Sequence, residues 1–173
     1  YIPINGVDLV TSGMPCETFS TAGNTSRSFY DDRQFLYRQG IRIAEICKAK
    51  FLLFENVPGI TSKRISKESK KLIVDQIEEE LNKHGFINHK RFILNASEFG
   101  VPQNRRRFFI LATKDNKIEL EAPLPKKNVN KVTVRDAFID LPDVIPNSNI
   151  EATDYINGPS EYANLMKNDS FWN

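Results

Sequence analysis

Cys16 is the first residue of the chain that could do chemistry, because its thiol follows an abrupt break in an apolar segment. Residues 7–10 predict a buried strand, which Gly13, Met14 and Pro15 then end. A strand end followed by a stiff turn is how an α/β protein presents one side chain at the edge of its sheet. A lone cysteine is more often a small core residue. A nucleophilic role needs a base or positive charge nearby, which favours the thiolate.

A carboxyl group follows the second apolar segment, since residues 51–54 end at Glu55. Uniformly apolar runs of this kind are typical of central parallel strands. An apolar floor beneath the side chain is expected to raise the pKa of Glu55 towards the range of a general acid. Structural alternatives, in which Glu55 caps the following turn or pairs with an arginine, are equally consistent with the sequence.

Three consecutive arginines, residues 105–107, precede a further apolar segment. At the start of a strand, Arg105 and Arg107 share one face and Arg106 takes the other. Two guanidinium groups on one face, with Gln103 close by, suit a phosphate or the polar edge of a heterocycle. The alternative is a set of surface salt bridges. The apolar residues that follow require partners for any inward arginine.

The elements that must position these groups alternate between strands and helices. Residues 34–49 predict an amphipathic helix between the first two strands, with Cys47 as a core residue and an inward stripe of Leu36, Ile43, Ile46 and Cys47. Strand, helix and strand form a βαβ unit, so the carboxyl ends that carry Cys16 and Glu55 meet at one edge of the sheet.

A second helix is predicted over residues 65–84, with Gly85 just after its end. A basic cluster around the start of this helix could contact phosphates, although a solvated face is the preferred interpretation: Lys63, Arg64, Lys67, Lys70 and Lys71. Residues 87–94 then alternate like a peripheral strand, and residues 108–112 predict an apolar strand antiparallel to its neighbour.

Composition points to an ordinary globular chain of 173 residues with a net charge of +2. Two cysteines cannot build a disulfide framework and show no zinc spacing, so we expect a reduced, intracellular setting, without metal or membrane. Towards the end of the chain, residues 132–141 predict a short helix capped by Thr133.

In this order and spacing, the motifs resemble those of the cytosine-C5 DNA methyltransferases. The resemblance covers residues 7–142 and rests on Pro15-Cys16, Glu55-Asn56-Val57 and Gln103-x-Arg105-x-Arg107. It implies an α/β fold: a partial Rossmann-like methyltransferase sheet with the later strands only, flanking helices and an irregular C-terminal tail. It also implies methylation of cytosine C5 in double-stranded DNA from S-adenosyl-L-methionine, with the target base flipped out of the duplex.

The resemblance also implies a role for each matching residue. Cys16 adds to carbon 6 of the base, Glu55 interacts with ring N3, and Asn56 holds the pocket. Arg107 contacts the cytosine O2, and Arg105 supports the cysteine loop or a phosphate. Two further pairs of positions match contacts with the cofactor and with the nucleic acid: Pro15 and Leu36 for the cofactor, Ser20 and Gln103 for the DNA. The loop over residues 18–33 is expected to close over the flipped base.

The chain also departs from the family's pattern. Met14 and Glu17 stand where the family commonly has a proline and a glutamine beside the cysteine, so Glu17 puts a negative charge where a glutamine usually faces DNA. The family's glycine-rich cofactor loop and its target-recognition domain have no counterpart here. The resemblance therefore implies a truncated portion that does not methylate alone. In it, residues 1–125 are the catalytic half of the methyltransferase domain, and residues 126–173 are a linker and tail leading toward a missing target-recognition domain. Three hypotheses stay open. The first is a DNA methyltransferase with an associated restriction endonuclease, cytoplasmic if bacterial and otherwise intracellular or nuclear. The second is a tRNA cytosine methyltransferase, and the third is a non-catalytic nucleic-acid-binding fragment.

Overall fold

The computed structural model describes residues 6–15, 32–125, 131–141 and 158–167. They belong to two compact units. Unit 1 comprises Tyr1–Leu94 and Arg106–Leu124, and unit 2 comprises Asn95–Arg105 and Pro125–Asn173. Unit 1 holds the sheet and its two longer helices, whereas unit 2 holds short helices only among its described residues.

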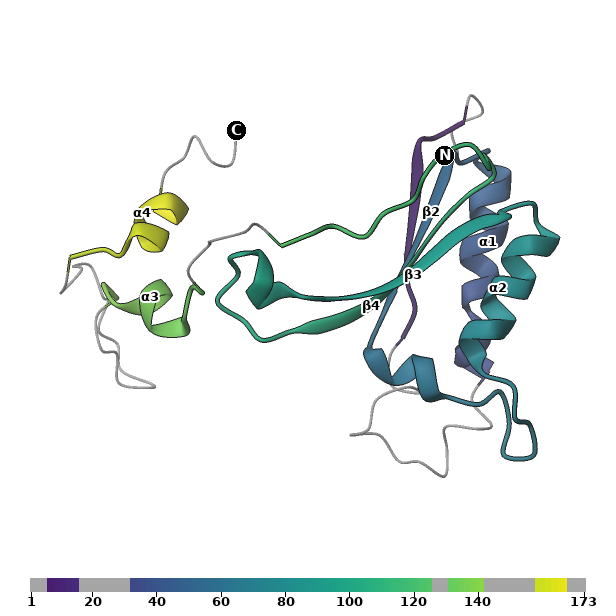
Figure 1. Ribbon diagram of the computed structural model, residues 1–173, viewed down its shortest axis with the longest axis horizontal. Helices are drawn as coiled ribbons and strands as arrows, with labels where there is room; N and C mark the ends of the chain where they lie inside the picture. Colours follow the sequence, from purple (N-terminus) through teal and green to yellow (C-terminus); the bar gives the residue numbers. More distant parts are fainter. Residues whose placement is uncertain (1–5, 16–31, 126–130, 142–157, 168–173) are drawn as a thin grey trace, which may run out of the picture. The chain divides into compact units, whose positions relative to one another are not determined.

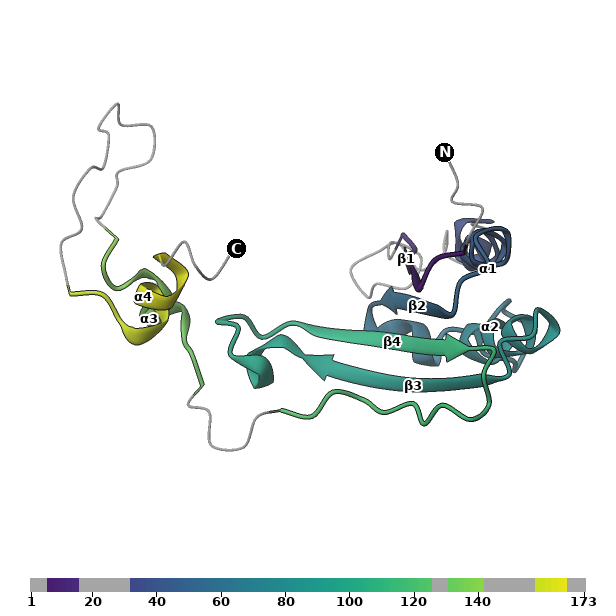
Figure 2. The same cartoon turned by 90° about the horizontal axis from the view of Figure 1, so that it is seen from above.

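A four-stranded sheet in the order β1-β2-β4-β3 is the frame of unit 1 (Figure 1). Its strands are β1 (Leu9–Gly13), β2 (Phe51–Asn56), β3 (Asn88–Asn95) and β4 (Arg106–Thr113). β1 and β2 are parallel, β2 and β4 are antiparallel, and the arrows of β3 and β4 run in opposite directions in Figure 2. The predicted α/β class, βαβ unit and peripheral third strand are confirmed.

The prediction of a buried first strand is wrong. β1 begins at Leu9 rather than at residue 7 and lies at the edge of the described sheet, where Leu9 is 48% exposed. A central parallel strand is covered on both faces, whereas an edge strand with one open face leaves alternate side chains accessible. Residues 7–10 are apolar enough for either place, so the pattern could not distinguish them.

Helices α1 (Tyr37–Ile46) and α2 (Ile73–Lys83) lie side by side against one face of the sheet (Figures 1 and 2). A short 3-10 helix, η1 (Asp32–Phe35), leads into α1. The core between the helices and the sheet contains Tyr37, Ile41, Leu52, Phe54, Ile77, Leu81, Phe86 and Ile110. Cys47 is 7% exposed, which confirms its prediction as a core residue.

The predicted inward stripe of the first helix is otherwise wrong. Leu36, Ile43 and Ile46 are 39–46% exposed, and the buried side of α1 is Tyr37, Gly40, Ile41 and Ala44. The reason is a close approach at Gly40, where an added Cβ would lie 2.7 Å from Ser12 Oγ and 2.9 Å from Phe54. The side of α1 that carries Gly40 and Ala44 therefore faces the sheet, with Tyr37 and Ile41 packed beside them, and Leu36, Ile43 and Ile46 point elsewhere.

The second helix is shorter than predicted, because α2 begins at Ile73 and not at residue 65. β2 is followed by a 3-10 helix, η2 (Pro58–Ser62), and then by a hairpin closed by an antiparallel bridge between Arg64 and Leu72. At the other end, Gly85 has a φ of +82°, a left-handed conformation that suits its predicted place after the helix.

In unit 2, η3 (Ala96–Phe99), α3 (Val134–Phe138) and α4 (Glu161–Lys167) are described. Thr133 caps α3 and forms a capping box with Asp136, as predicted. Lys167 of α4 pairs with Asp140, which is 1% exposed, and Ser160 donates a hydrogen bond to the Asp136 carbonyl. These contacts hold the two short helices together.

Candidate active site

An ion pair at the end of β2 brings two of the predicted site residues together. Arg107 Nε lies 2.7 Å from Glu55 Oε1, and the side chains are 22% and 40% exposed, respectively. Arg107 also donates from its guanidinium to the Arg106 carbonyl at 2.9 Å. Of the alternatives left open for Glu55, pairing with an arginine is the arrangement that the structure has.

Strand register explains why these two side chains meet. In the antiparallel pair of β2 and β4, Glu55 lies opposite Phe109, and Asn56 lies opposite Phe108. Because side chains alternate, Arg107 and Phe109 share the face that carries Glu55, away from the helices. On the other side of β2, Glu55 lies opposite Gly13 of β1, where even an added Cβ would stay 3.8 Å from Glu55 Oε2.

Asn56 ties the end of β1 to the end of β2. Its side chain is 2% exposed and points to the opposite face from Glu55. Asn56 Nδ2 donates to the Met14 carbonyl at 3.3 Å, and the Val57 amide donates to Asn56 Oδ1 at 2.8 Å. This amide therefore fixes the backbone one residue before Pro15, where the chain leaves the sheet towards Cys16.

The remaining predicted residues are less closely connected. Arg105 precedes β4, so the strand alternation expected for the arginines begins only at Arg106. Arg105 and Gln103 belong to unit 2, where Gln103 lines a shallow groove of about 470 Å³ with residues that include Asn95, Ser97, Asn104, Lys131 and Thr133. Leu36 is the N-cap of α1 and is 39% exposed.

Cys16, Ser20 and most of the loop over residues 18–33 lie outside the described residues. Sequence reasoning missed two other parts of the site: the Met14 carbonyl, which Asn56 holds, and Gly13, which leaves room beside Glu55. A glycine directly before the break in the first strand was the available signal for the latter.

Metal and membrane features are absent from the parts of the chain that the structure describes. No group of three or more His, Cys, Asp and Glu side chains there could hold a metal ion. Nor does any described helix combine the length and apolar character needed to cross a membrane.

Comparison with known proteins identifies the family. Residues 2–168 match the family model of the C-5 cytosine-specific DNA methylases. Curated relatives include the type II methyltransferase M.DdeI of Desulfomicrobium norvegicum (31% identity over 98% of this chain and 41% of the relative). Another is M.FnuDI of Fusobacterium nucleatum (36% identity over 79% of this chain and 38% of the relative). The chain thus spans about two fifths of the length of these relatives.

Solved structures agree with this result. A prophage-encoded protein of E. coli, described as a candidate DNA modification methyltransferase, superposes with a TM-score of 0.60 and 29% identity. That match covers 80% of this chain and 36% of the other. The methyltransferase EhMeth of Entamoeba histolytica has a TM-score of 0.50 at 18% identity, over 77% of this chain and 43% of that one, and shows the likeness of fold alone. The chain belongs to the C-5 cytosine-specific DNA methylase family.

Proposed function

We propose that this chain carries the base-facing catalytic groups of an S-adenosylmethionine-dependent DNA methyltransferase that modifies carbon 5 of a flipped cytosine. One observation supports this most strongly: Glu55 and Arg107 form a pair at the strand end where Asn56 holds the backbone before Pro15 and Cys16. An acid and a guanidinium at one sheet edge, with a thiol two residues further along the chain than the carbonyl that Asn56 binds, are the groups that a polar aromatic ring needs for activation.

In the proposed reaction, the Cys16 thiolate forms a bond to carbon 6 of the cytosine. The electrons of the C5–C6 double bond move towards carbon 5 and the ring, and Glu55 offsets the charge that develops at N3 by a hydrogen bond or a proton. Arg107 donates to O2, for which its guanidinium must turn partly from Glu55. Once carbon 5 has been methylated, loss of its proton restores the double bond and expels the Cys16 thiolate.

The cofactor would be held only in part by this chain. Leu36 offers a half-exposed aliphatic side chain, and Pro15 follows the carbonyl that Asn56 fixes, so both suit apolar contact with one side of S-adenosylmethionine. When bound, the cofactor supplies an electrophilic methyl group on a sulfonium centre. Neither residue offers the polar groups that its ribose and carboxylate require, so other residues must make these contacts.

Double-stranded DNA is the proposed substrate, because residues 2–168 match the family model of the C-5 cytosine-specific DNA methylases and the relatives are named as type II methyltransferases. The activity of the whole protein, and its pairing with a restriction endonuclease, are parts of the same proposal. We further propose that residues 1–173 alone do not methylate DNA. Transfer of a labelled methyl group by this segment on its own would contradict that statement.

A covalent trap tests the proposed reaction. The substrate is a long duplex in which 5-fluorocytosine replaces cytosine throughout, so that the recognition sequence need not be known. The hydrogen at carbon 5 of cytosine is lost as a proton, but the fluorine that replaces it cannot be lost as a cation. The Cys16–C6 bond therefore persists after methyl transfer. The full-length protein is expected to form a denaturation-resistant adduct when S-adenosylmethionine is present.

Matched cysteine variants make the trap specific. Cys16→Ala should abolish the adduct, whereas Cys47→Ala should keep it, because Cys47 is a buried residue at the end of α1. The same trap on fluorinated transfer RNA tests the alternative substrate. An adduct on RNA alone, no adduct at all, or one that survives Cys16→Ala would each refute the proposal.

A further inference from the structure

The basic cluster that follows the candidate site lies on a fixed hairpin and not on a helix. The hairpin comprises residues 63–72 and is closed by the bridge between Arg64 and Leu72. Ile65 N donates to the Lys71 carbonyl at 3.1 Å, and Ile73 N donates to the Lys63 carbonyl at 2.9 Å. Ile65 and Leu72 also pack against the core, so the base of the hairpin is anchored.

Positive charge on the hairpin is concentrated and largely unneutralised. Its ten residues include five basic side chains and one acidic one, a net charge of +4 against +2 for the whole chain. Arg64, Lys67 and Lys70 are exposed, and none of the three has an ion-pair partner in the described part of the chain. Lys71 differs, because it pairs with Glu79.

Apart from Glu79, which pairs with Lys71, and Glu68 of the hairpin itself, the acids on the neighbouring helix α2 are paired with residues outside this cluster. Arg91 of β3 forms ion pairs with both Asp75 and Glu78, and its Nη2 lies 2.9 Å from Asp75 Oδ1. Glu80 pairs with Lys83 at 3.1 Å. Like charges gathered without counterions raise the free energy of the folded chain unless an anionic partner is present. If these side chains contacted only solvent, nothing would favour gathering so many positive charges in one hairpin.

The hairpin is also close in the chain to the site, through a rigid connection. Asn56 ends β2, and η2 leads from it to Lys63 with Ile60 fully buried and Thr61 Oγ1 bonded to the Pro58 carbonyl at 2.9 Å. Five residues of 3-10 helix add about 10 Å at their usual rise. That distance corresponds to roughly three base-pair steps of 3.4 Å along one strand of duplex DNA.

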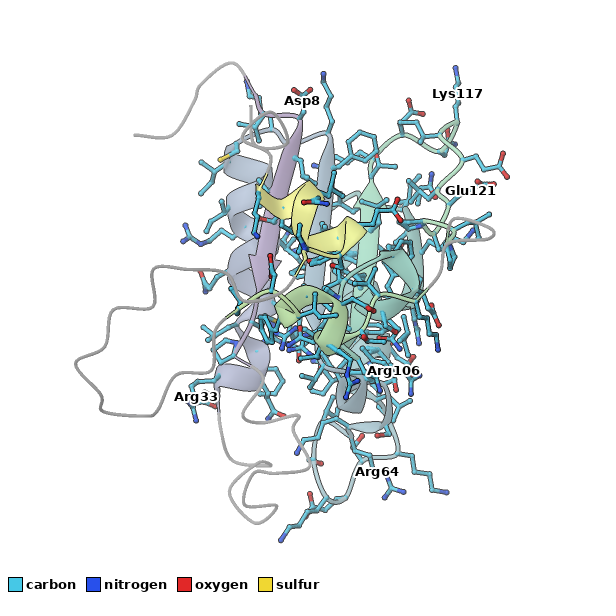
Figure 3. The ribbon with its side chains drawn as sticks, turned by 90° about the vertical axis from the view of Figure 1, so that its left-hand side faces the viewer. Asp8, Arg33, Arg64, Arg106, Lys117 and Glu121 are labelled. Atoms are coloured by element: carbon cyan, nitrogen blue, oxygen red, sulfur yellow. The ribbon has the colours of Figure 1, made fainter. Side chains whose placement is uncertain are left out.

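We propose that the hairpin over residues 63–72 binds the phosphate backbone of DNA beside the base held at Glu55. The inference rests on the proposed function, since it takes DNA as the substrate. Arg64, Lys67 and Lys70 supply the contacts, and the anchored base of the hairpin keeps them in register with the strand end. Figure 3 shows Arg64 at one end of unit 1, with Asp8 and Lys117 at the other.

The test compares two triple variants of the protein that contains this chain. In the hairpin variant, Arg64→Gln, Lys67→Gln and Lys70→Gln remove three exposed charges. The matched control removes three exposed lysines near the opposite ends of the strands: Lys48→Gln, Lys114→Gln and Lys117→Gln. Binding to a mixed-sequence DNA duplex is measured over a series of salt concentrations, and adduct formation on 5-fluorocytosine DNA is measured beside it.

Each lost phosphate contact should reduce the slope of log K against log salt by about 0.9. The hairpin variant is therefore expected to show a slope shallower by about 2–3 and at least tenfold weaker binding, with adduct formation restored as salt is lowered. The control should match the unmodified protein in both respects. Equal slopes for the hairpin variant and the unmodified protein, while adduct still forms, overturn the hairpin's role and leave the proposed function standing.

Two further outcomes complete the test. If the unmodified protein forms no adduct on DNA, the proposed function fails, whatever the salt slopes show. If the hairpin variant loses affinity for transfer RNA but keeps its affinity for duplex DNA, the hairpin binds the wrong nucleic acid for this proposal, and the inference is overturned.

Discussion

Asn56→Asp replaces the amide NH2 group of a buried side chain with an oxygen, and so removes the donor that binds the Met14 carbonyl at the end of β1. The carboxylate oxygen that replaces Nδ2 would face the Met14 carbonyl oxygen across 3.3 Å with no proton between them. The other oxygen would still accept from the Val57 amide at 2.8 Å. The substitution therefore isolates the tether between the two strands from the local turn after β2.

The expected loss of stability is large for so small a change. Asn56 is 2% exposed, so the new carboxylate is a buried charge without a cation, for which about 3–5 kcal/mol is typical. Because the entropy of unfolding grows with chain length, a loss of 3 kcal/mol in a chain of this length corresponds to a fall in Tm of roughly 6–12 °C. The folded state disfavours the charged form, so the pKa of the introduced carboxyl is raised above its unfolded value of about 3.9.

The sign of the pH dependence follows from that raised pKa. Below about pH 3.9 the carboxyl is protonated in both states and can donate to the Met14 carbonyl, so the penalty is absent there. The penalty grows as the pH rises above 3.9 and is complete once the pH exceeds the folded-state pKa. Relative to the unmodified protein, the variant should therefore be more destabilised at pH 7.5 than at pH 4.5.

Thermal unfolding followed by circular dichroism at the two pH values measures this difference. Asn116→Asp is the matched control, because Asn116 is exposed and the same change should leave Tm within about 1 °C. A Tm for Asn56→Asp equal to that of the control at pH 7.5 would falsify the tether. A loss that is the same at both pH values would show that the missing hydrogen bond, rather than buried charge, is responsible.

Three further predictions concern packing, capping and the ion pair. Gly40→Ala should cost about 1–3 kcal/mol in thermal unfolding through its overlap with Ser12, and adding Ser12→Gly should restore part of the loss. Thr133→Ala should cost about 1 kcal/mol by breaking the capping box, whereas Thr133→Ser should retain it; equal melting curves would contradict the cap. Arg107→Met should slow adduct formation about 100-fold, as loss of one preorganised donor does, yet cost about 1 kcal/mol or less in stability because the pair with Glu55 is partly exposed. An unchanged adduct rate, or a collapse of the fold, would refute that assignment.

The strands could be predicted from the sequence because their signal is local. Residues 51–54 and 108–112 are nearly uniform apolar runs, and the structure places them in the two central strands, β2 and β4. The capping-box motif of four residues from Thr133 to Asp136 likewise predicts the start of α3. In each case the physical cause lies within one short segment.

Contacts with other segments, by contrast, decided two features of the helices that the sequence predicted wrongly: the buried side of α1 and the start of α2. The aliphatic residues of α1 fall on both sides of the helix, and Gly40 and Ala44 decide which side meets the sheet, because only small residues permit that approach. The hairpin over residues 63–72 has charged and apolar residues at helical spacing. What decides its conformation is a bridge to Leu72 and the anchoring of Ile65, neither of which a periodicity reveals.

The candidate site depends on contacts between segments far apart in the chain, which explains both what its motifs predicted and what they did not. Arg107 is 52 positions from Glu55, and Asn56 is 42 positions from Met14, yet the register of β1, β2 and β4 brings each pair together. Sequence motifs identified these residues but not their partners, because the partners include a backbone carbonyl. All of these contacts lie within unit 1. The positions of Glu55 and Asn56 therefore follow from the sheet's own hydrogen bonds, and substitutions that disturb register should affect the acid and the tether together.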